Sequence, residues 1–216
     1  MFTEPPAAIA QIAQRAQRQE QGVVIYRMHR IFDVAAGPKH RHEDLELAVV
    51  SRDTLTVKIR VLHSTVDGNP SDSAALQKIE DQYEHPKAAD VFHRPFDPQY
   101  LPEYTYQALN ATTYQFTGVV RDSAHGDGTF TVDSDGNVVS YQYVPCALPQ
   151  YSKSATIAYE RSQVLPGTWE VTSERRHYTG RFAFVNGSAT ATMTYDSYAR
   201  YPDVSSAEAA LVKFAY

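Results

Sequence analysis

Hydrophobic and polar positions alternate along most of this chain, most clearly between Gly180 and Tyr201, GRFAFVNGSATATMTYDSYARY. In the second half of this stretch every other residue is apolar and its neighbours are polar, the apolar set being Ala189, Ala191, Met193 and Tyr195. Side chains alternate between the two faces of a strand. The dipeptide Asn186-Gly187 readily takes the positive φ angles of a tight turn. The pattern therefore predicts a hairpin that reverses there, with Phe182 and Phe184 on one face of its first strand.

Similar strands are predicted along the rest of the chain, at 23–34, 42–51, 55–63, 104–108, 112–121, 128–133, 138–144, 155–163 and 169–177. The third is the most regular, since Leu55, Val57, Ile59 and Val61 alternate with polar residues. Turn signals separate the later strands at Asp127-Gly128, Asp135-Gly136, Pro149 and Pro166-Gly167. The connections are too short for crossover helices, so the pairing is antiparallel. About ten strands with one apolar face must curve, close or stack.

Helices are predicted at both ends of the chain. Thr3-Glu4-Pro5-Pro6 resembles a helix entry, and the helix should run to about Gln19, with Gly22 as its stop. Its apolar positions form a narrow stripe that suits docking on the sheet, namely Ile9, Ile12, Ala13 and Ala16. Near the other end, Ser205 and Glu208 have capping-box spacing and predict a short terminal helix.

The regular alternation stops between residues 64 and 101. Asp67-Gly68-Asn69-Pro70 has turn chemistry, 73–83 has the composition of one short helix, and several prolines follow. Long irregular connections in compact domains are often lids or binding loops. We therefore treat residues 1–216 as one domain with a lid-like insert at 64–101. The alternative is a segment that only covers the sheet.

The segment 92–106, FHRPFDPQYLPEYTY, is the predicted ligand-binding region. Its prolines restrict the chain and lower the entropy that is lost when apolar side chains dock. The candidate residues are Phe92, Phe96, Tyr100, Leu101 and Tyr104. They are expected to plug the open end of a cavity in the sheet. The alternative is that they close the core beneath a loop.

Composition narrows the functional classes. Hydrophobic residues make up 43% and charged residues 21% of the 216 residues, as in globular proteins. The 15 tyrosines suit half-wet sheets and ligand cavities, because each ring has an apolar body and a polar tip. A net charge of −5 with scattered basic residues gives no footprint for nucleic acid. Cys146 is the single cysteine, which excludes an internal disulfide and a cysteine-based zinc site.

Sequence motifs for catalysis are missing. The chain has no GxSxG, P-loop or GxGxxG pattern, and we name no catalytic residue and no cofactor. His40, His42 and Glu43, joined by His63, could assemble a zinc-like set, but the first three belong to a charged hairpin end. DSDGN at 133–137 lacks the remaining ligands of a calcium loop and reads as a hairpin turn. We therefore expect no stoichiometric zinc or calcium.

The order of these elements resembles the LolA/LolB/LppX-like superfamily of bacterial envelope lipoprotein carriers. The resemblance is one of layout, carried by AAIAQIAQRAQRQEQ, LTVKIRVL, GTFTVDSDGNVVSYQY and the final hairpin. It implies an unclosed half-barrel whose concave apolar face is covered by helices. Members of the family carry lipid chains, and the superfamily also includes a cofactor-free enzyme of violacein biosynthesis. In the family's carrier an arginine on an early strand holds the lid, which makes Arg27 and Arg30 candidates here. Cys146 lies deep in the chain and not at a lipobox, so the chain as given is not a lipoprotein.

Two functional hypotheses follow. The first is a non-catalytic carrier for a lipid-like or apolar ligand in the bacterial envelope, with peripheral contact to a membrane or a lipoprotein. The second is a small cofactor-independent enzyme that uses the same cavity, with His29, His63 or Arg27 as polar participants. Two or more titratable groups converging in the cavity would favour the enzyme.

The expected location is periplasmic. MFTEPPAAIA lacks the basic and apolar regions of a signal peptide, so either a signal has been removed or the protein is cytoplasmic. Met1 directly before a helix start favours removal.

Overall fold

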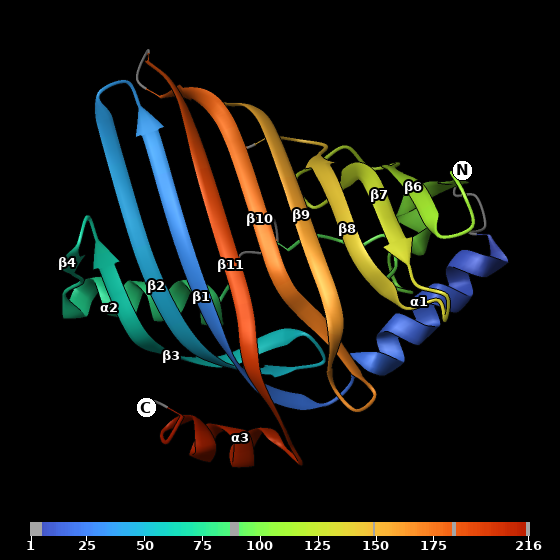
Figure 1. The fold of residues 1–216 in the computed structure, drawn as a ribbon, viewed down its shortest axis with the longest axis horizontal. Helices are drawn as coiled ribbons and strands as arrows, with labels where there is room; N and C mark the ends of the chain where they lie inside the picture. The colour runs from blue at the N-terminus through green and yellow to red at the C-terminus, as the bar shows by residue number, and fades with distance from the viewer. Residues whose placement is uncertain (1–5, 87–90, 149, 183–184, 215–216) are drawn as a thin grey trace.

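A computed structural model describes residues 6–86, 91–148, 150–182 and 185–214. Within them, eleven strands form one antiparallel sheet in the order β4-β3-β2-β1-β11-β10-β9-β8-β7-β6-β5, and the sheet is curved and unclosed (Figure 1). The strands are β1 Val23–Ala36, β2 Lys39–Arg52, β3 Leu55–Val66, β4 Asn69–Pro70, β5 Tyr104–Ala108, β6 Thr113–Gly118, β7 Gly126–Val132, β8 Val138–Pro145, β9 Ser152–Leu165, β10 Thr168–Phe182 and β11 Val185–Tyr201. The predicted mainly β half-barrel is confirmed.

The first and last strands of the chain meet in the middle of this sheet. β1 pairs with β11 along almost its whole length, from Val23 opposite Tyr201 to Ala36 opposite Gly187. This pairing joins the β1–β4 half of the sheet to the β5–β10 half. As predicted, Ala189, Ala191 and Met193 of β11 are buried, and the threonines between them are exposed.

The predicted turn at Asn186-Gly187 is wrong. Asn186 lies opposite Arg181 and Gly187 opposite Gly180, so both belong to the ladder between β10 and β11. Gly187 also pairs with Ala36 of β1, and pairing on both sides overrides the local turn preference. The reversal lies between Phe182 and Val185. Phe184 and the Phe182 side chain lie outside the described residues.

Two other local predictions are corrected. Asp127-Gly128 is not a turn but part of β7, where a Cβ on Gly128 would come within 1.9 Å of the Gln142 carbonyl oxygen. Glycine is needed there for close strand approach. In β3 a register shift separates Val57 from Ile59, so these two residues join different core clusters.

One face of the sheet, here called the inner face, carries the side chains of Tyr159, Glu174 and Met193, which lie directly opposite one another on β9, β10 and β11. Helix α1 (Ala7–Gln19) contributes its predicted apolar stripe to a core cluster with the aromatic side chains of β5–β9. Helix α2 (Ser73–Glu84) adds Ile79 and Tyr83 to the cluster of β1–β3 and β11. The predicted N-terminal helix and helix-bearing insert are therefore confirmed.

Helix α3 (Val204–Leu211) lies on the opposite face. It packs on Ala48 and Val50, which alternate along β2 with the inner-face residues Leu47 and Val49. Its N-cap is Asp203, whose side chain accepts a hydrogen bond from the Ser206 backbone N–H, so the predicted Ser205 cap is wrong. Asp203, and not Ser205, is the N-cap because it is the last extended residue before the first turn of the helix.

Among the described residues, none of the helices has the length and apolar character needed to cross a membrane.

The first prediction concerns Phe96, which is fully buried in the cluster beneath α1. Phe96→Ala should lower the free energy of unfolding by about 3–5 kcal/mol, because it leaves a cavity in a packed core. The control Leu109→Ala, at a side chain that is 51% exposed, should change it by less than about 0.5 kcal/mol. Urea unfolding measures both, and a loss of under about 1 kcal/mol for Phe96→Ala would show that this ring is not a core residue.

Candidate functional site

A cavity of about 350 Å³ opens on the inner face of the sheet, between the insert and the strands β1, β9, β10 and β11. Its volume lies at the lower end of the range found for small-molecule sites. Most of its wall is aromatic or aliphatic, from Tyr26, Leu55, Val91, Phe92, Tyr100, Tyr159, Val171, Tyr195 and Tyr198. Its polar lining consists of Ser51, Asp53, Thr54, Arg94, Asp97, Gln99 and Glu170.

A second cavity, of about 440 Å³, adjoins the first and is mostly polar. The two share a rim made of Asp53, Thr54, Arg94, Asp97 and Gln99. The second cavity is completed by residues at the end of α1 and in the insert, namely Gln17, Glu20, Gln21 and Pro98. An apolar compartment therefore borders a polar one.

The turn between β2 and β3 forms part of this rim in an unusual conformation. Asp53 and Thr54 have φ angles of 51° and 69°, in the left-handed region that β-branched residues such as threonine rarely adopt. The turn is tied to the segment after α1 by two hydrogen bonds. The Asp53 backbone N–H donates to the Gly22 carbonyl at 3.0 Å, and the Asp53 carboxylate accepts from the Gly22 N–H at 2.8 Å. Such backbone strain persists where the surrounding contacts fix it, often at binding sites.

A buried charge cluster closes the polar end of the cavity. Glu20, the C-cap of α1, accepts two hydrogen bonds from Arg94 of the insert, at 2.9 and 2.6 Å. It also accepts one from Arg161 of β9, whose side chain is fully buried. Arg94 in turn holds the Asp97 carboxylate at 2.7 and 3.0 Å. The cluster thus contains two carboxylates and two guanidinium groups.

The pKa directions in this cluster follow from burial and from the arginines. Burial works to raise the pKa of Glu20, but Arg94 and Arg161 together hold it below its ordinary value. For Asp97 burial prevails, and its pKa is raised although Arg94 opposes the shift. Both guanidinium carbons also lie over the Phe96 ring, at 5.2 and 5.5 Å from its centroid. The Phe96 ring therefore makes cation–π contacts with both arginines and also packs in the hydrophobic core.

Glu170 of β10 is the most perturbed carboxyl of the cavity wall. Burial, followed by the negative charge of Glu20, raises its pKa to about 7, although Arg161 and Arg94 oppose the shift. No described side chain or backbone group donates a hydrogen bond of standard geometry to it. Glu170 therefore lies in the cavity wall as a group that gains or loses a proton near neutral pH.

Tyrosine side chains form a further part of the cavity wall. The Tyr26 ring contacts the Tyr195 ring edge-to-face, with 5.9 Å between the ring centroids, and its centroid lies 5.4 Å from that of Tyr198. The Tyr195 hydroxyl donates to the buried Glu174 carboxylate at 2.8 Å, and that of Tyr198 donates to the Val171 carbonyl. The hydroxyl groups of Tyr195 and Tyr198 thus have acceptors within the protein, and both side chains line the cavity.

The structure divides the five predicted ligand-binding residues into two groups. Phe92 and Tyr100 line the cavity. The Phe92 ring stacks on Tyr143 with 3.7 Å between the ring centroids, and the Tyr100 ring stacks on His93 with 3.9 Å. Phe96, Leu101 and Tyr104 lie instead in the core cluster beneath α1. The 3-10 helix η2 (Leu101–Glu103) follows Tyr100 and leads into β5, which begins at Tyr104. Ligand contact remains a prediction for Phe92 and Tyr100.

The polar participants expected on the early strands lie elsewhere. Arg27, His29 and His63 do not line either cavity; Arg27 pairs with Glu46 and His29 with Asp44. Arg30 lies on the inner face and donates to the Tyr83 hydroxyl of α2 at 3.2 Å. Of the two arginines considered for holding the insert, Arg30 is therefore the one that contacts it. Sequence reasoning missed Glu20, Arg94, Arg161 and Glu170, which no short motif connects.

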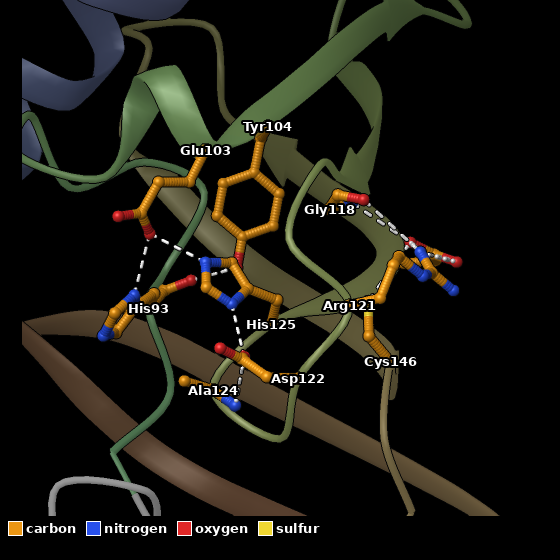
Figure 2. Close-up of polar contacts among 10 residues, drawn as sticks. His93, Glu103, Tyr104, Gly118, Arg121, Asp122, Ala124, His125 and Cys146 are labelled. Carbon is orange, nitrogen blue, oxygen red and sulfur yellow. Dashed lines mark hydrogen bonds and ion pairs between the residues drawn. The ribbon is translucent and has the colours of Figure 1, made fainter. Parts of the chain in front are cut away.

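A second polar cluster includes the residue directly before Arg94 and lies on the β5–β8 side of the sheet (Figure 2). His93, Glu103 and His125 converge there, and they form the one group of three potential metal ligands in the described part of the chain. The set His40, His42, Glu43 and His63 does not converge: His42 pairs with Asp33, and Glu43 with Arg30 and Arg41. The residues of the new cluster are too far apart in sequence to form a spacing motif.

No family model and no curated protein matches this sequence. Similar solved structures include a lipoprotein-sorting protein domain from Vibrio parahaemolyticus, described as putative (11% identity, 90% of this chain and 93% of that one, TM-score 0.46). Another is a LolA superfamily protein from Nitrosomonas europaea (10% identity, 94% of this chain and 96% of that one, TM-score 0.39). A third is lipovitellin (9% identity, 85% of this chain, TM-score 0.44), of which this chain spans 26%. The superfamily named for the second is the one that the order of elements resembles.

The second prediction is a pH dependence caused by Glu170. Its folded pKa of about 7 exceeds the ordinary value of 4.5, so the folded state keeps a proton that the unfolded state has lost. Stability should therefore fall as the pH rises from about 5 to about 7.5, by about 1–3 kcal/mol for this group. Glu170→Gln should remove that part of the slope in urea unfolding, whereas Glu160→Gln, at an exposed position of the neighbouring strand, should keep it. Equal slopes in wild type and Glu170→Gln would contradict the shift.

Proposed function

We propose that this protein is a non-catalytic binding or carrier protein for an amphiphilic, lipid-like molecule held on the inner face of its sheet. The observation that carries the proposal is the cavity of about 350 Å³, whose wall is mostly tyrosine, phenylalanine and aliphatic side chains. Few, well-placed polar groups in a mainly apolar concave wall are typical of small-molecule sites.

The polar rim narrows the kind of ligand. The apolar wall ends at Arg94, Asp97 and Glu170, beside the polar second cavity. A ligand with an apolar body and a polar head would bury the body against the tyrosines and leave its head among these groups. A pure hydrocarbon would remove water from this charged rim and offer it no hydrogen bond in return, which is costly.

The place of action is part of the same proposal. We place the protein in the bacterial cell envelope, in the periplasm after removal of a signal, where it meets a membrane or a lipoprotein. The layout shared with the LolA/LolB/LppX-like superfamily supports this placement.

A small cofactor-independent enzyme remains the second candidate, and a specific observation favours keeping it. Glu170, Asp97 and Arg94 all line the cavity, and a carboxyl with a pKa of about 7 suits a general base at neutral pH. In a carrier, Glu170→Gln should alter only the affinity for a ligand. In an enzyme it should abolish turnover while the bound ligand stays in place.

The third prediction tests ligand binding. Val171 lines the cavity on β10, so Val171→Trp should fill it and weaken binding of a hydrophobic fluorophore such as 1-anilinonaphthalene-8-sulfonate at least tenfold. The control Val144→Trp, at a side chain that is 47% exposed and outside the cavity, should leave binding unchanged. Native mass spectrometry of the freshly purified wild type should show a co-purified lipid. No bound lipid together with equal fluorophore binding in all three proteins would exclude the cavity as a ligand site.

The fourth prediction concerns how a ligand would enter the cavity, with helix α2 as the gate that opens. Helix α2 has no fully buried residue, and it is held mainly by Ile79, Tyr83 and the contacts of Glu84 with Lys58 and the Ile59 N–H. The later part of the insert is anchored through Arg94 and Phe96. Amide hydrogen exchange should therefore be faster in 73–84 than in 45–50 of β2, and slower in 96–101 than in α2. Exchange in α2 as slow as in β2 would contradict a gate at this helix.

A further inference from the structure

The residues His93, Glu103 and His125 bring three potential metal-ligand atoms together, and they do so through the fold and not through a sequence motif.

 In the sequence, His93 lies 10 residues and His125 22 residues from Glu103. His93 Nδ1 and His125 Nε2 each lie 2.8 Å from the same carboxylate oxygen, Oε2 of Glu103. All three ligand atoms lie within 4.8 Å of one another (Figure 2).

The backbone around the cluster fixes both histidines. The His93 N–H donates to the Ala124 carbonyl at 2.8 Å, and the Tyr104 hydroxyl donates to the His93 carbonyl. On the other side, the Cys146 N–H donates to the His125 carbonyl at 2.8 Å. The insert is thus joined to the loop before β7, and the two imidazoles come from segments that these bonds hold in register.

An additional carboxylate stands behind one of the histidines. Asp122 Oδ1 lies 2.5 Å from His125 Nδ1, on the side of the ring away from Glu103. Metal-binding histidines commonly direct their second ring nitrogen to a carboxylate in this way, which orients the ring and increases its basicity. The Asp122 carboxylate is itself held by the Ala124 N–H at 2.9 Å.

We propose that His93 Nδ1, His125 Nε2 and the Glu103 carboxylate bind a divalent transition-metal ion of the Zn²⁺ type. Zinc is bound by imidazole nitrogen and carboxylate oxygen at about 2.0–2.2 Å, so tetrahedral ligand atoms lie roughly 3.3–3.5 Å apart. Each N···O pair of 2.8 Å must open by only about 0.5–0.7 Å to admit the ion. The two carboxylates of the cluster, Glu103 and Asp122, also match the charge of a divalent cation.

The site is open on one side, which suits a fourth ligand from solvent. The His125 side chain is 3% exposed, while those of His93 and Glu103 are 26% and 28% exposed. Three protein ligands with an open position are typical of zinc sites that bind water or a further molecule. The Cys146 thiol is not part of the set, since it faces Asp127 at 3.7 Å.

The ion would also connect this cluster with the cavity. His93 lies between Phe92 and Arg94, both of which line the cavity, and its ring stacks on Tyr100. A metal ion bound by both His93 and His125 would therefore hold the end of the insert that contains His93 against the sheet. The metal site does not depend on the proposed carrier function and stands or falls separately from it.

The test is a titration of tag-free, chelator-treated protein with Co²⁺, followed by displacement with Zn²⁺. Wild type should bind one Co²⁺ per chain with visible absorption typical of a nitrogen and oxygen site, and Zn²⁺ should abolish that absorption and raise the melting temperature. His93→Asn and His125→Asn should lose saturable binding. Asp122→Asn, which keeps all three ligands, should bind about 10–100-fold more weakly.

The matched control is His42→Asn, because His42 pairs with Asp33 at 2.7 Å on the surface and lies outside the cluster. It should bind Co²⁺ as wild type does. If the histidine variants fail to fold by circular dichroism, Glu103→Gln replaces them and should weaken binding at least tenfold. Absence of saturable binding by folded wild type would overturn the proposal, as would unchanged binding in the folded cluster variants or loss of binding in His42→Asn.

Discussion

The carboxylate of Glu20 holds three distant parts of the chain together. It ends α1, pairs with Arg94 of the insert and pairs with Arg161 of β9, in a place from which water is almost excluded. A buried ion pair contributes little net stability compared with a packed apolar core, but removing one partner leaves a buried charge that costs about 3–5 kcal/mol. The cluster therefore specifies one arrangement of helix, insert and sheet, and the polar end of the cavity exists because of it.

An open curved sheet needs this kind of cover. Its two edge strands, β4 and β5, do not meet, so the inner face is not sealed by the sheet itself. α1 and the segment around Phe96 seal the β5–β9 side with an apolar core. On the β1–β3 side, α2 contributes only partly buried side chains. From this unequal burial we expect the β1–β3 side of the inner face to open more easily than the β5–β9 side.

Much of the fold could be predicted from the sequence, because period-two alternation is a local signal. β5 was predicted to the residue, and the stripe of α1 was predicted in full. The errors occur where tertiary contacts override local preference. Asn186-Gly187 is held in the ladder by pairing with both β1 and β10, and Gly128 serves close strand approach. The site was less predictable, since aromatic residues between prolines suit a cavity wall and a core equally well. Phe92 and Phe96 show both outcomes within five residues.

The same limit explains why the charged groups of the cavity escaped sequence reasoning. Glu20, Arg94 and Arg161 are brought together by the fold across separations of 74 and 141 residues, and no spacing rule connects them. Their proximity has a chemical consequence for Glu170, whose pKa rises through burial and through the negative charge of Glu20. The Glu20 carboxylate, which holds α1, the insert and β9 together, thus helps to raise the pKa of Glu170 in the cavity wall. The carboxylate that joins α1, the insert and the sheet therefore also influences the charge of the cavity wall at neutral pH, so the packing of the cover and the protonation of Glu170 are coupled at this end of the cavity.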